Sequence, residues 1–289
     1  MKPARFHYVR PASIAEAVLL LAEHGEDASI LAGGQSLMPV LNMRLSRPRV
    51  VVDINRIAKL KGIALADGAV RIGALARHVE VMRSPLIARH LPLIAEAMPN
   101  VAHVAVRNRG TFGGSVALAD PSAEMPACLL ALGGAVVLES TRGRRQVAAE
   151  DYFHGLYDTA RRPDELLIEA LIPPQRPDTL SAFMELSRRH GDFAIAGLAC
   201  TLRHDAGVIH APRLVYFGSE PRPVLARTAM AALDGKAWSP ATHDAVAAAL
   251  ADDLDPIDNT FGSPAAKLHL QRVVTRRVLD GLPDKARAA

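Results

Sequence analysis

Two glycine pairs, Gly33-Gly34 and Gly113-Gly114, constrain the fold of this 289-residue chain more than any other feature. Each pair is followed closely by a serine, Ser36 or Ser115. Because glycine has no Cβ, main-chain N–H groups in such a turn can approach a phosphate, and a helix that starts there adds a partial positive charge. Together the two turns could hold one pyrophosphate, whereas either turn alone is more often an ordinary tight turn.

The usual nucleotide-binding and catalytic motifs are absent from the sequence. Neither glycine turn has the spacing of a GxGxxG fingerprint or the lysine of a P-loop, which argues against both folds. The 11 histidines are scattered, and no GxSxG elbow surrounds either serine. Cys128 and Cys200 form no CxxC pair, whereas an iron–sulfur cluster normally takes about four thiolates. We therefore expect no metal site, no hydrolase chemistry and no cluster on this chain.

Patterns in the first part of the chain predict short alternating elements. Ser13 and Glu16 form a capping box, and apolar residues at helical spacing follow until Gly25. The run after Gly62 alternates in the way typical of a hairpin. In order, we predict a helix over 14–24, a strand over 28–32, a helix over 37–45, a strand over 50–54 and a hairpin over 62–72 that turns at Asp67-Gly68.

The rest of the chain is predicted to divide at a proline-rich linker. Pro173-Pro174 and Pro177 stop both helix and sheet, so we place a domain boundary near residue 177. Asp120 suits a helix N-cap and Pro121 the first helical position. The predicted elements are a helix over 121–131, a hairpin with arms 135–140 and 145–149, a strand over 165–172, three antiparallel strands over 181–188, 193–204 and 208–218, and helices over 224–233, 241–250 and 265–279. The fold class is therefore α+β, with about two domains.

Composition and charge exclude several classes of protein. With 49% hydrophobic and 22% charged residues, the chain is not a disordered tail. The net charge is +4, but the basic residues form scattered pairs and only 4% of residues are aromatic, so nucleic-acid binding is not expected. The longest uncharged apolar stretch, 125–138, is shorter than the roughly 18 residues of a membrane span, and the first residues lack the apolar core of a secretion signal. We expect a cytoplasmic protein without a membrane span.

Three longer motifs resemble a known family. The first two resemble the FAD-binding medium subunit of molybdenum hydroxylases, the carbon monoxide dehydrogenase and xanthine dehydrogenase group. The third resembles a segment at the start of that family's C-terminal domain, so the resemblance covers the whole chain. The motifs are residues 31–39 (LAGGQSLMP) with Arg44 and 52–54 (VDI), residues 107–115 (RNRGTFGGS) with 119–124 (ADPSAE), and residues 187–194 (SRRHGDFA).

The resemblance implies a two-part FAD-binding domain of the vanillyl-alcohol-oxidase (PCMH) type in residues 1–177, with subdomains of about 1–56 and 57–177. A smaller C-terminal domain of the carbon monoxide dehydrogenase flavoprotein type, with a three-stranded antiparallel sheet and helices, is implied for residues 178–289. The implied FAD-binding residues are Ala32, Gly33, Gly34, Gln35, Ser36, Leu37, Ala102, Thr111, Phe112, Gly113, Gly114, Ser115, Asp120, Glu124 and Phe193.

Within this set the resemblance implies different roles. Residues 32–36 and 111–115 would wrap the FAD pyrophosphate, largely through main-chain N–H groups. Asp120 or Glu124 would accept a hydrogen bond from a ribose or ribitol hydroxyl. Ala102 would approach the flavin, and Phe193 would lie near the isoalloxazine ring. Two simpler interpretations stay open: Asp120 as a plain helix cap, and Phe193 as a core aromatic.

The sequence departs from the family pattern at a few positions. Gln35 and Phe112 stand where some relatives have His and Ile, and both changes look tolerable. Several relatives carry a lysine two to four residues before the paired arginines, able to face the pyrimidine edge of the flavin, whereas Met184 and Glu185 occupy that stretch here. A cation near the flavin N1 favours the anionic reduced form, so its absence is expected to lower the flavin potential.

The function implied by the resemblance is that of an oxidoreductase subunit that transfers electrons and oxidises no substrate by itself. A large subunit with a molybdopterin cofactor would oxidise the substrate, and a small subunit with [2Fe-2S] clusters would relay electrons to FAD on this chain. The acceptor would be quinone, O2 or NAD, and the assembly a dimer of heterotrimers with an exposed apolar or mixed patch on both domains of this chain. A self-sufficient FAD-dependent oxidase of the same fold and a scaffold without cofactor stay open as alternatives.

Overall fold

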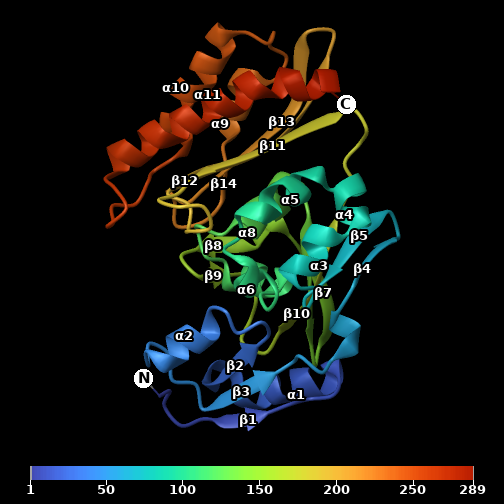
Figure 1. Cartoon of the computed structure of the whole chain (residues 1–289). Coiled ribbons are helices and arrows are strands. Elements are labelled where there is room, and N and C mark those ends of the chain that lie inside the picture. The colour runs from blue at the N-terminus through green and yellow to red at the C-terminus, as the bar shows by residue number, and fades with distance from the viewer. Residues whose placement is uncertain (1, 289) are drawn as a thin grey trace.

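The computed structural model describes residues 2–288 and arranges them in three tiers (Figure 1). The N-terminal residues, in blue, form the lowest tier, and the middle of the chain, in cyan and green, forms the central tier. The C-terminal residues, in orange and red, form the uppermost tier. Among residues 2–288, no helix combines the length and the apolar character that crossing a bilayer requires.

The lowest tier is a small parallel sheet with a helix packed on it. Its strands are β1 (His7–Val9), β2 (Ala28–Leu31) and β3 (Val50–Asp53), in the order β1-β3-β2. Helix α1 (Ile14–His24) confirms the predicted range, and Ser13 caps it by accepting a hydrogen bond from Glu16 N. Because β2 and β3 run parallel, their carboxyl ends meet at one edge of the sheet, and the first glycine turn leaves from that edge.

Two details of this tier differ from the prediction. Strand β1 was not predicted, since three residues with two exposed side chains carry almost no periodic signal. Helix α2 (Leu37–Asn42) ends three residues before the predicted residue 45. The cause is Arg44, whose φ of 58° lies in the left-handed region and cannot continue a right-handed helix.

The central tier is built on a five-stranded sheet in the order β4-β5-β10-β6-β7. The predicted hairpin at Asp67-Gly68 is confirmed, with both residues at positive φ. The helix predicted from residue 121 starts instead at Glu124, because Asp120 closes a turn with Ser122 N. The elements of this tier are β4 (Ile63–Ala66), β5 (Ala69–Gly73), α3 (His78–Arg83), α4 (Pro85–His90), α5 (Pro92–Ala97), α6 (Val104–Arg107), α7 (Phe112–Leu118), α8 (Glu124–Ala131), β6 (Ala135–Ser140), β7 (Gly143–Ala148), β8 (Phe153–Gly155), β9 (Asp158–Thr159) and β10 (Leu166–Ile172).

The uppermost tier is an antiparallel sheet covered by helices. The three predicted antiparallel strands are confirmed. A short fourth strand, β14 (Val224–Leu225), pairs with β13 and replaces the start of the helix expected from residue 224. The turn expected at residues 205–207 is present, with Ala206 and Gly207 at positive φ. The remaining elements are β11 (Thr179–Leu186), β12 (Ala196–Asp205), β13 (Val208–Phe217), α9 (Arg227–Leu233), α10 (Pro240–Asp253) and α11 (Pro264–Ala288).

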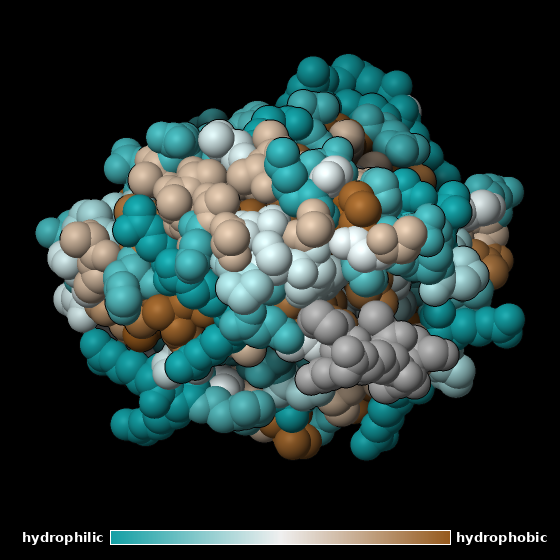
Figure 2. All heavy atoms as spheres, turned by 90° about the horizontal axis from the view of Figure 1, so that it is seen from above, coloured by the Kyte–Doolittle hydropathy of each residue, from teal (hydrophilic) through white to brown (hydrophobic). Residues whose placement is uncertain are grey.

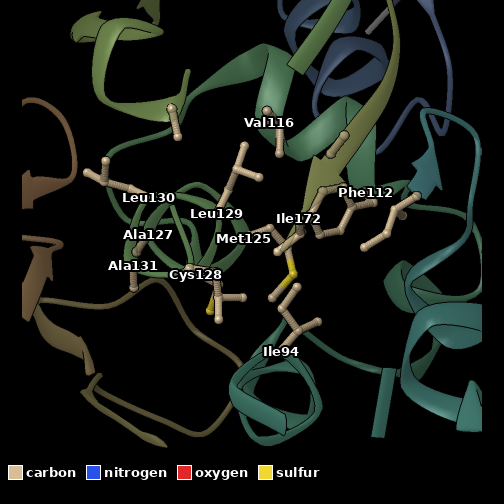
Figure 3. Packing of buried hydrophobic residues seen from close by; sticks show 14 of the residues in the cluster. Ile94, Phe112, Val116, Met125, Ala127, Cys128, Leu129, Leu130, Ala131 and Ile172 are labelled. Atoms are coloured by element: carbon tan, nitrogen blue, oxygen red, sulfur yellow. The ribbon is translucent and has the colours of Figure 1, made fainter. Parts of the chain in front are cut away.

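The largest apolar core crosses from the central to the uppermost tier. Helix α8 lies at its centre, and from that helix Met125 points toward Phe112 and Ile172 while Leu129 points toward Val116 (Figure 3). The same cluster includes Phe183, Val215 and Phe217 from β11 and β13. Because one core is shared, the two upper tiers are held against each other, and the segment after β11 has a fixed place beside the central tier.

Candidate cofactor site

The two glycine turns lie against each other although they belong to different tiers. Gly33 is buried, and a Cβ added to it would lie 2.4 Å from the carbonyl oxygen of Arg109 and 2.8 Å from the Cα of Gly110. From the other side, a Cβ on Gly114 would lie 3.9 Å from the Cβ of Ala32. The end of β2 and the start of α7 therefore form one site, and no larger residue fits at position 33 without moving the backbone.

The first turn presents main-chain donors that have no partner in the chain. In the part of the chain that the structure describes, the N–H groups of Gly33, Gly34, Gln35 and Ser36 have no hydrogen-bond acceptor. The carbonyl groups are used instead: Gly33 O accepts a hydrogen bond from Gln35 Nε2 at 3.0 Å, and Ala32 O accepts one from Asn55 Nδ2 at 2.8 Å. Successive unpaired N–H groups make a concavity suited to an anion. The turn therefore fits a phosphate, and Leu37 begins α2 directly after it.

The second turn differs, because the main-chain N–H groups of residues 112–115 already have acceptors. Thr111 caps α7, and its hydroxyl and carbonyl oxygens accept from Gly114 N and Ser115 N, both at 3.0 Å. Phe112 N and Gly113 N donate to Ala76 O and Ala74 O at 2.9 Å and 3.1 Å. Among the described residues, the groups that this turn can still offer a ligand are the N–H group of Thr111 and the hydroxyls of Thr111 and Ser115. Of the N–H contacts expected at residues 111–115, only the one from Thr111 therefore stays available.

Close packing accounts for the small residues of the second turn. A Cβ on Gly113 would lie 2.5 Å from the Cα of Ala74, and one on Gly110 would lie 2.8 Å from His78 Cδ2. Burial, together with the charges of Arg107 and Arg77, lowers the pKa of His78 to about 4, so the ring that touches Gly110 is neutral near pH 7. Phe112 is fully buried in the core beside Ile172 and Met125, so its side chain does not face the first turn (Figure 3).

A set of polar side chains that the sequence did not predict connects the two turns. Asn55 follows β3, and its Nδ2 donates to Ala32 O and, at 2.6 Å, to Asp53 Oδ1. Its Oδ1 accepts a hydrogen bond from Arg77 Nη2 at 2.6 Å, and Arg77 Nη1 donates to the carbonyl of Arg109. One signal pointed here: Asp53 belongs to the first motif, and Asn55 lies only two residues beyond it.

The charged side chains of Arg77 and Arg109 interact where the two turns meet, and Glu80 and Asp53 also act on Arg77 there. Burial, followed by the like charge of Arg109, lowers the pKa of the Arg77 guanidinium. Two neighbouring cations repel each other, and a bound anion between them would relieve that repulsion. The charge therefore matches the unpaired N–H groups of the first turn, since both favour a phosphate.

Asp120 and Glu124 form a second polar group beyond the far end of α7. The seven-residue helix is about 10 Å long, so Asp120 does not reach a phosphate bound at Thr111. Asp120 Oδ1 accepts a hydrogen bond from Ser122 N at 2.9 Å, and Oδ2 accepts one from Tyr157 OH at 3.2 Å. It does not cap α8, whose N-cap position is Ala123. Burial raises the pKa of Asp120.

Two buried carboxyl groups lie where the central and uppermost tiers meet. Burial, with a smaller contribution from Asp120, raises the pKa of Glu124 to about 7. Burial and the charge of Glu124 raise the pKa of Glu185 to about 8, and Glu185 Oε2 has no hydrogen-bond partner among the described residues. Near neutral pH Glu185 is therefore mostly protonated and Glu124 is partly protonated, so Glu185 supplies no cation and little negative charge there.

The last two predicted residues lie on neighbouring loops of different tiers. Ala102 has a φ of 43°, and its carbonyl would be 2.7 Å from a Cβ on Gly191, so the loop after β11 touches the loop before α6. Arg107 Nη1 fixes the latter by donating to Val101 O and Ala102 O, both at 2.8 Å. Phe193, on the loop after β11, is 61% exposed, which excludes the core-aromatic interpretation.

Among the residues that the structure describes, no group of three or more His, Cys, Asp and Glu side chains could hold a metal ion. The two cysteine thiols are both buried, and burial raises the pKa of Cys128 well above its usual range.

Comparison with known proteins assigns both halves of the chain to families. Residues 4–175 match the model of the FAD binding domain in molybdopterin dehydrogenase. Residues 181–282 match that of the CO dehydrogenase flavoprotein C-terminal domain.

Similar proteins extend over nearly the full chain. It is 39% identical over 290 residues to the 6-hydroxypseudooxynicotine dehydrogenase complex subunit alpha of Paenarthrobacter nicotinovorans, covering 99% of this chain and 97% of that one. It is 35% identical over 280 residues to the carbon monoxide dehydrogenase medium chain of Hydrogenophaga pseudoflava, covering 97% of this chain and 98% of that one.

A solved structure agrees with this likeness. Carbon monoxide dehydrogenase from Hydrogenophaga pseudoflava, in a form that lacks the Mo-pyranopterin moiety of the molybdenum cofactor, superimposes with a TM-score of 0.95 at 37% identity, covering 98% of each chain. The two-part FAD-binding domain and the smaller C-terminal domain expected from the sequence are both present. The chain belongs to the family of FAD-binding medium subunits of molybdenum hydroxylases.

Proposed function

We propose that one FAD is held with its pyrophosphate against the first glycine turn and enclosed by the second. The observation that carries this proposal is the run of four unpaired N–H groups from Gly33 to Ser36. They lie beside Arg77 and Arg109, in a turn where a Cβ at Gly33 would collide with backbone. An anion of two negative charges suits this combination of donors and cations.

We propose further contacts between the cofactor and the remaining predicted residues. Thr111 and Ser115 would donate hydroxyl hydrogen bonds to the pyrophosphate. Asp120 or Glu124, about one helix length away, would accept a bond from a ribose or ribitol hydroxyl. Ala102 and Phe193 would lie toward the flavin. The domain boundary near residue 177 is also a proposal, supported by the gap between the two matched regions.

In this proposal the chain takes part in electron transfer between partner subunits and an external acceptor. Bound FAD supplies a redox group that can exchange electrons singly or in pairs. The chain's own residues bind and orient it. Two buried cysteines cannot supply the roughly four thiolates of a cluster. Electrons would therefore come from the [2Fe-2S] clusters of a small subunit, after a large molybdopterin subunit has oxidised the substrate, and go to quinone, O2 or NAD.

The surface of the chain is compatible with partner subunits. On the face seen from above, hydrophobic residues appear in small groups between hydrophilic ones (Figure 2), which is the mixed character of a polar interface rather than a membrane surface. Large hydrophobic side chains are exposed on both domains, and they are Tyr8, Leu19, Met43, Leu45, Leu65, Val104, Leu156, Tyr157, Phe193 and Phe261. We propose that the subunits form a dimer of heterotrimers, as the resemblance implies.

The test is to load the purified chain with FAD, remove free cofactor by gel filtration, and measure bound FAD by absorbance after release. We expect about one FAD per chain and none for Gly114→Val, whose side chain would displace the Thr111 cap only 2.6 Å away. The loaded chain should then be reduced by partner subunits supplied with substrate, and not by substrate alone. Oxidation of an alcohol or aldehyde by the isolated chain would instead identify a self-sufficient oxidase. A complex that releases no FAD would leave only a scaffold.

A further inference from the structure

In the described part of the chain, Asn55 and Arg77 form the only hydrogen-bonded side-chain connection between the two glycine turns, and we call it the Asn55–Arg77 link. One end holds the carbonyl of Ala32, at the entrance of the first turn. The other end holds the carbonyl of Arg109, two residues before Thr111. The link therefore joins the lowest tier to the central tier at the place where the proposed pyrophosphate would bind.

We propose that Asn55 and Arg77 are positioning residues that set the spacing of the two glycine turns and thereby the affinity of the chain for a pyrophosphate. This inference rests on the proposed FAD site. Neither residue has to touch the cofactor, because each acts on a carbonyl whose own turn carries the donor groups. A turn that is already held at the correct spacing loses less conformational entropy when the ligand binds.

The hydrogen bonds of Asn55 leave little freedom at this position. Its amide donates to Ala32 O and Asp53 Oδ1, and its Oδ1 accepts from Arg77, so all three contacts fix one orientation of the amide. Asp53 is itself held by Tyr8 OH and Asn55 N. Burial raises the pKa of Asp53, but these hydrogen bonds lower it by more, so the net shift is downward. The carboxylate therefore stays charged and keeps Asn55 in place.

Arg77 is suited to the other end because its planar guanidinium donates in two directions. Nη2 reaches Asn55 and Nη1 reaches Arg109 O, and that oxygen is also the atom nearest to the Gly33 position. The backbone beside it is fixed as well, since His78 N donates to Gly110 O at 3.0 Å and Phe112 N to Ala76 O at 2.9 Å. Arg77 therefore holds Asn55, and with it the first turn, at a fixed distance from the central tier.

The experiment measures binding of FAD and of ADP, which carries the same pyrophosphate, to the full-length apo chain by calorimetry. For Asn55→Ala and Arg77→Gln we expect both dissociation constants to rise about 10- to 100-fold, the loss typical of one hydrogen bond to a charged group. Arg77→Lys keeps a cation and a donor and should recover part of the lost affinity. The double variant should bind no more weakly than the weaker single variant, because both residues act through one link.

The control variant is Arg71→Gln, which removes an arginine paired with Glu169 in the same tier but away from the turns. Its thermal midpoint should fall as much as that of Arg77→Gln while FAD binding stays unchanged. Normal FAD and ADP binding by Asn55→Ala and Arg77→Gln, with binding lost in Gly33→Val, would overturn the link and leave the proposed site intact. Normal binding by Gly33→Val as well would overturn the proposed site itself.

Discussion

The two glycine turns look alike in the sequence, yet the structure uses their glycines in different ways. At the first turn, Gly34 has a φ of 73°, and the N–H groups from Gly33 to Ser36 are unpaired within the described chain. At the second turn, the N–H groups of residues 112–115 are bonded to the chain itself, and Gly113 is packed against Ala74. The first turn therefore has free N–H groups that can bind an anion, and the second turn is fixed by hydrogen bonds to its own chain.

The difference shows why one site needs both turns. A row of unpaired donors is costly unless water or a ligand satisfies it, so the first turn gains stability when an anion binds there. A turn fixed by its own backbone bonds supplies a rigid wall and a few hydroxyls. The cofactor site combines one turn that binds with one turn that is rigid. Changing the two turns separately tests this division of roles.

The largest effect is expected on stability at the second turn. In Gly113→Ala the new Cβ would lie 2.5 Å from Ala74 Cα. Because a Cβ is fixed to its own backbone and Ala74 Cα is a backbone atom, helix α7 must shift. We expect a loss of about 3 kcal/mol or more in the free energy of unfolding, measured in urea. Gly155→Ala, where no atom lies closer than 4.0 Å, is the control. Equal, small losses in both variants would show that Gly113 is not a packing residue.

A smaller effect on stability but a direct effect on binding is expected at the first turn. Gly34→Ala places a side chain on a residue with a φ of 73°, which costs about 1 kcal/mol and tilts the neighbouring N–H groups. We expect about a tenfold loss of FAD affinity. Gly68→Ala carries the same backbone strain, with a φ of 74° and open space around it at a hairpin tip. It should lose somewhat less stability, because a Cβ on Gly34 would also lie 3.2 Å from Leu31 Cδ1 and Met38 Cγ, and it should lose no affinity. A matching loss of affinity would refute the role of the first turn.

The pH dependence of stability tests the acid pair, which belongs to neither turn. Glu124 and Glu185 have pKa values of about 7 and 8 in the folded chain, above the 4.5 of an ordinary glutamate. The folded state therefore binds more protons, and the stability they contribute is complete below pH 4.5 and lost as pH rises through 7 to 8. The thermal midpoint of the apo chain should fall between pH 6 and pH 9, by about 3 to 6 °C more than in Glu124→Gln/Glu185→Gln.

An exposed glutamate provides the comparison for that measurement. Glu23→Gln, on the outer side of α1, should keep the full pH dependence of the parent chain. If the double variant falls as steeply as the parent, the buried carboxyl groups are not the source of the effect.

The smallest effect is expected for the hydroxyl groups. Ser115→Ala removes one of the few groups that the second turn can offer, and FAD affinity should fall about threefold, as for one ordinary hydrogen bond. Ser36→Ala should change affinity less, because the donor at that position is the main-chain N–H, which remains. A larger loss for Ser36→Ala, measured by the same calorimetric titration, would reverse the assignment of the two turns.

The sequence predicted which segments form the site better than it predicted how they work. Gly33 and Gly114 were expected to cooperate, and the structure brings their turns together. The acceptors that occupy the second turn are Ala74 and Ala76, whose approach depends on the tertiary fold, so no local pattern reveals them. Arg77 was missed for the same reason: it lies in neither motif, and its partners come from two different tiers.

The fold shows the same division between local and distant causes. Helix α1 was predicted to the residue because its cap, its apolar spacing and its terminal glycine are all local. Strand β14, two residues long, exists only because β13 offers an edge with which it can pair. The start of α8 at Glu124 depends on a turn closed by Asp120, a residue that could equally have capped a helix.

Amide hydrogen exchange at single-residue resolution, with and without FAD, tests the central claim most directly. In the apo chain the unpaired N–H groups of Gly33, Gly34, Gln35 and Ser36 should exchange rapidly, and those of residues 112–115 slowly. FAD should protect the first set strongly and change the second set little. Strong new protection at residues 112–115, with none at residues 33–36, would contradict the account.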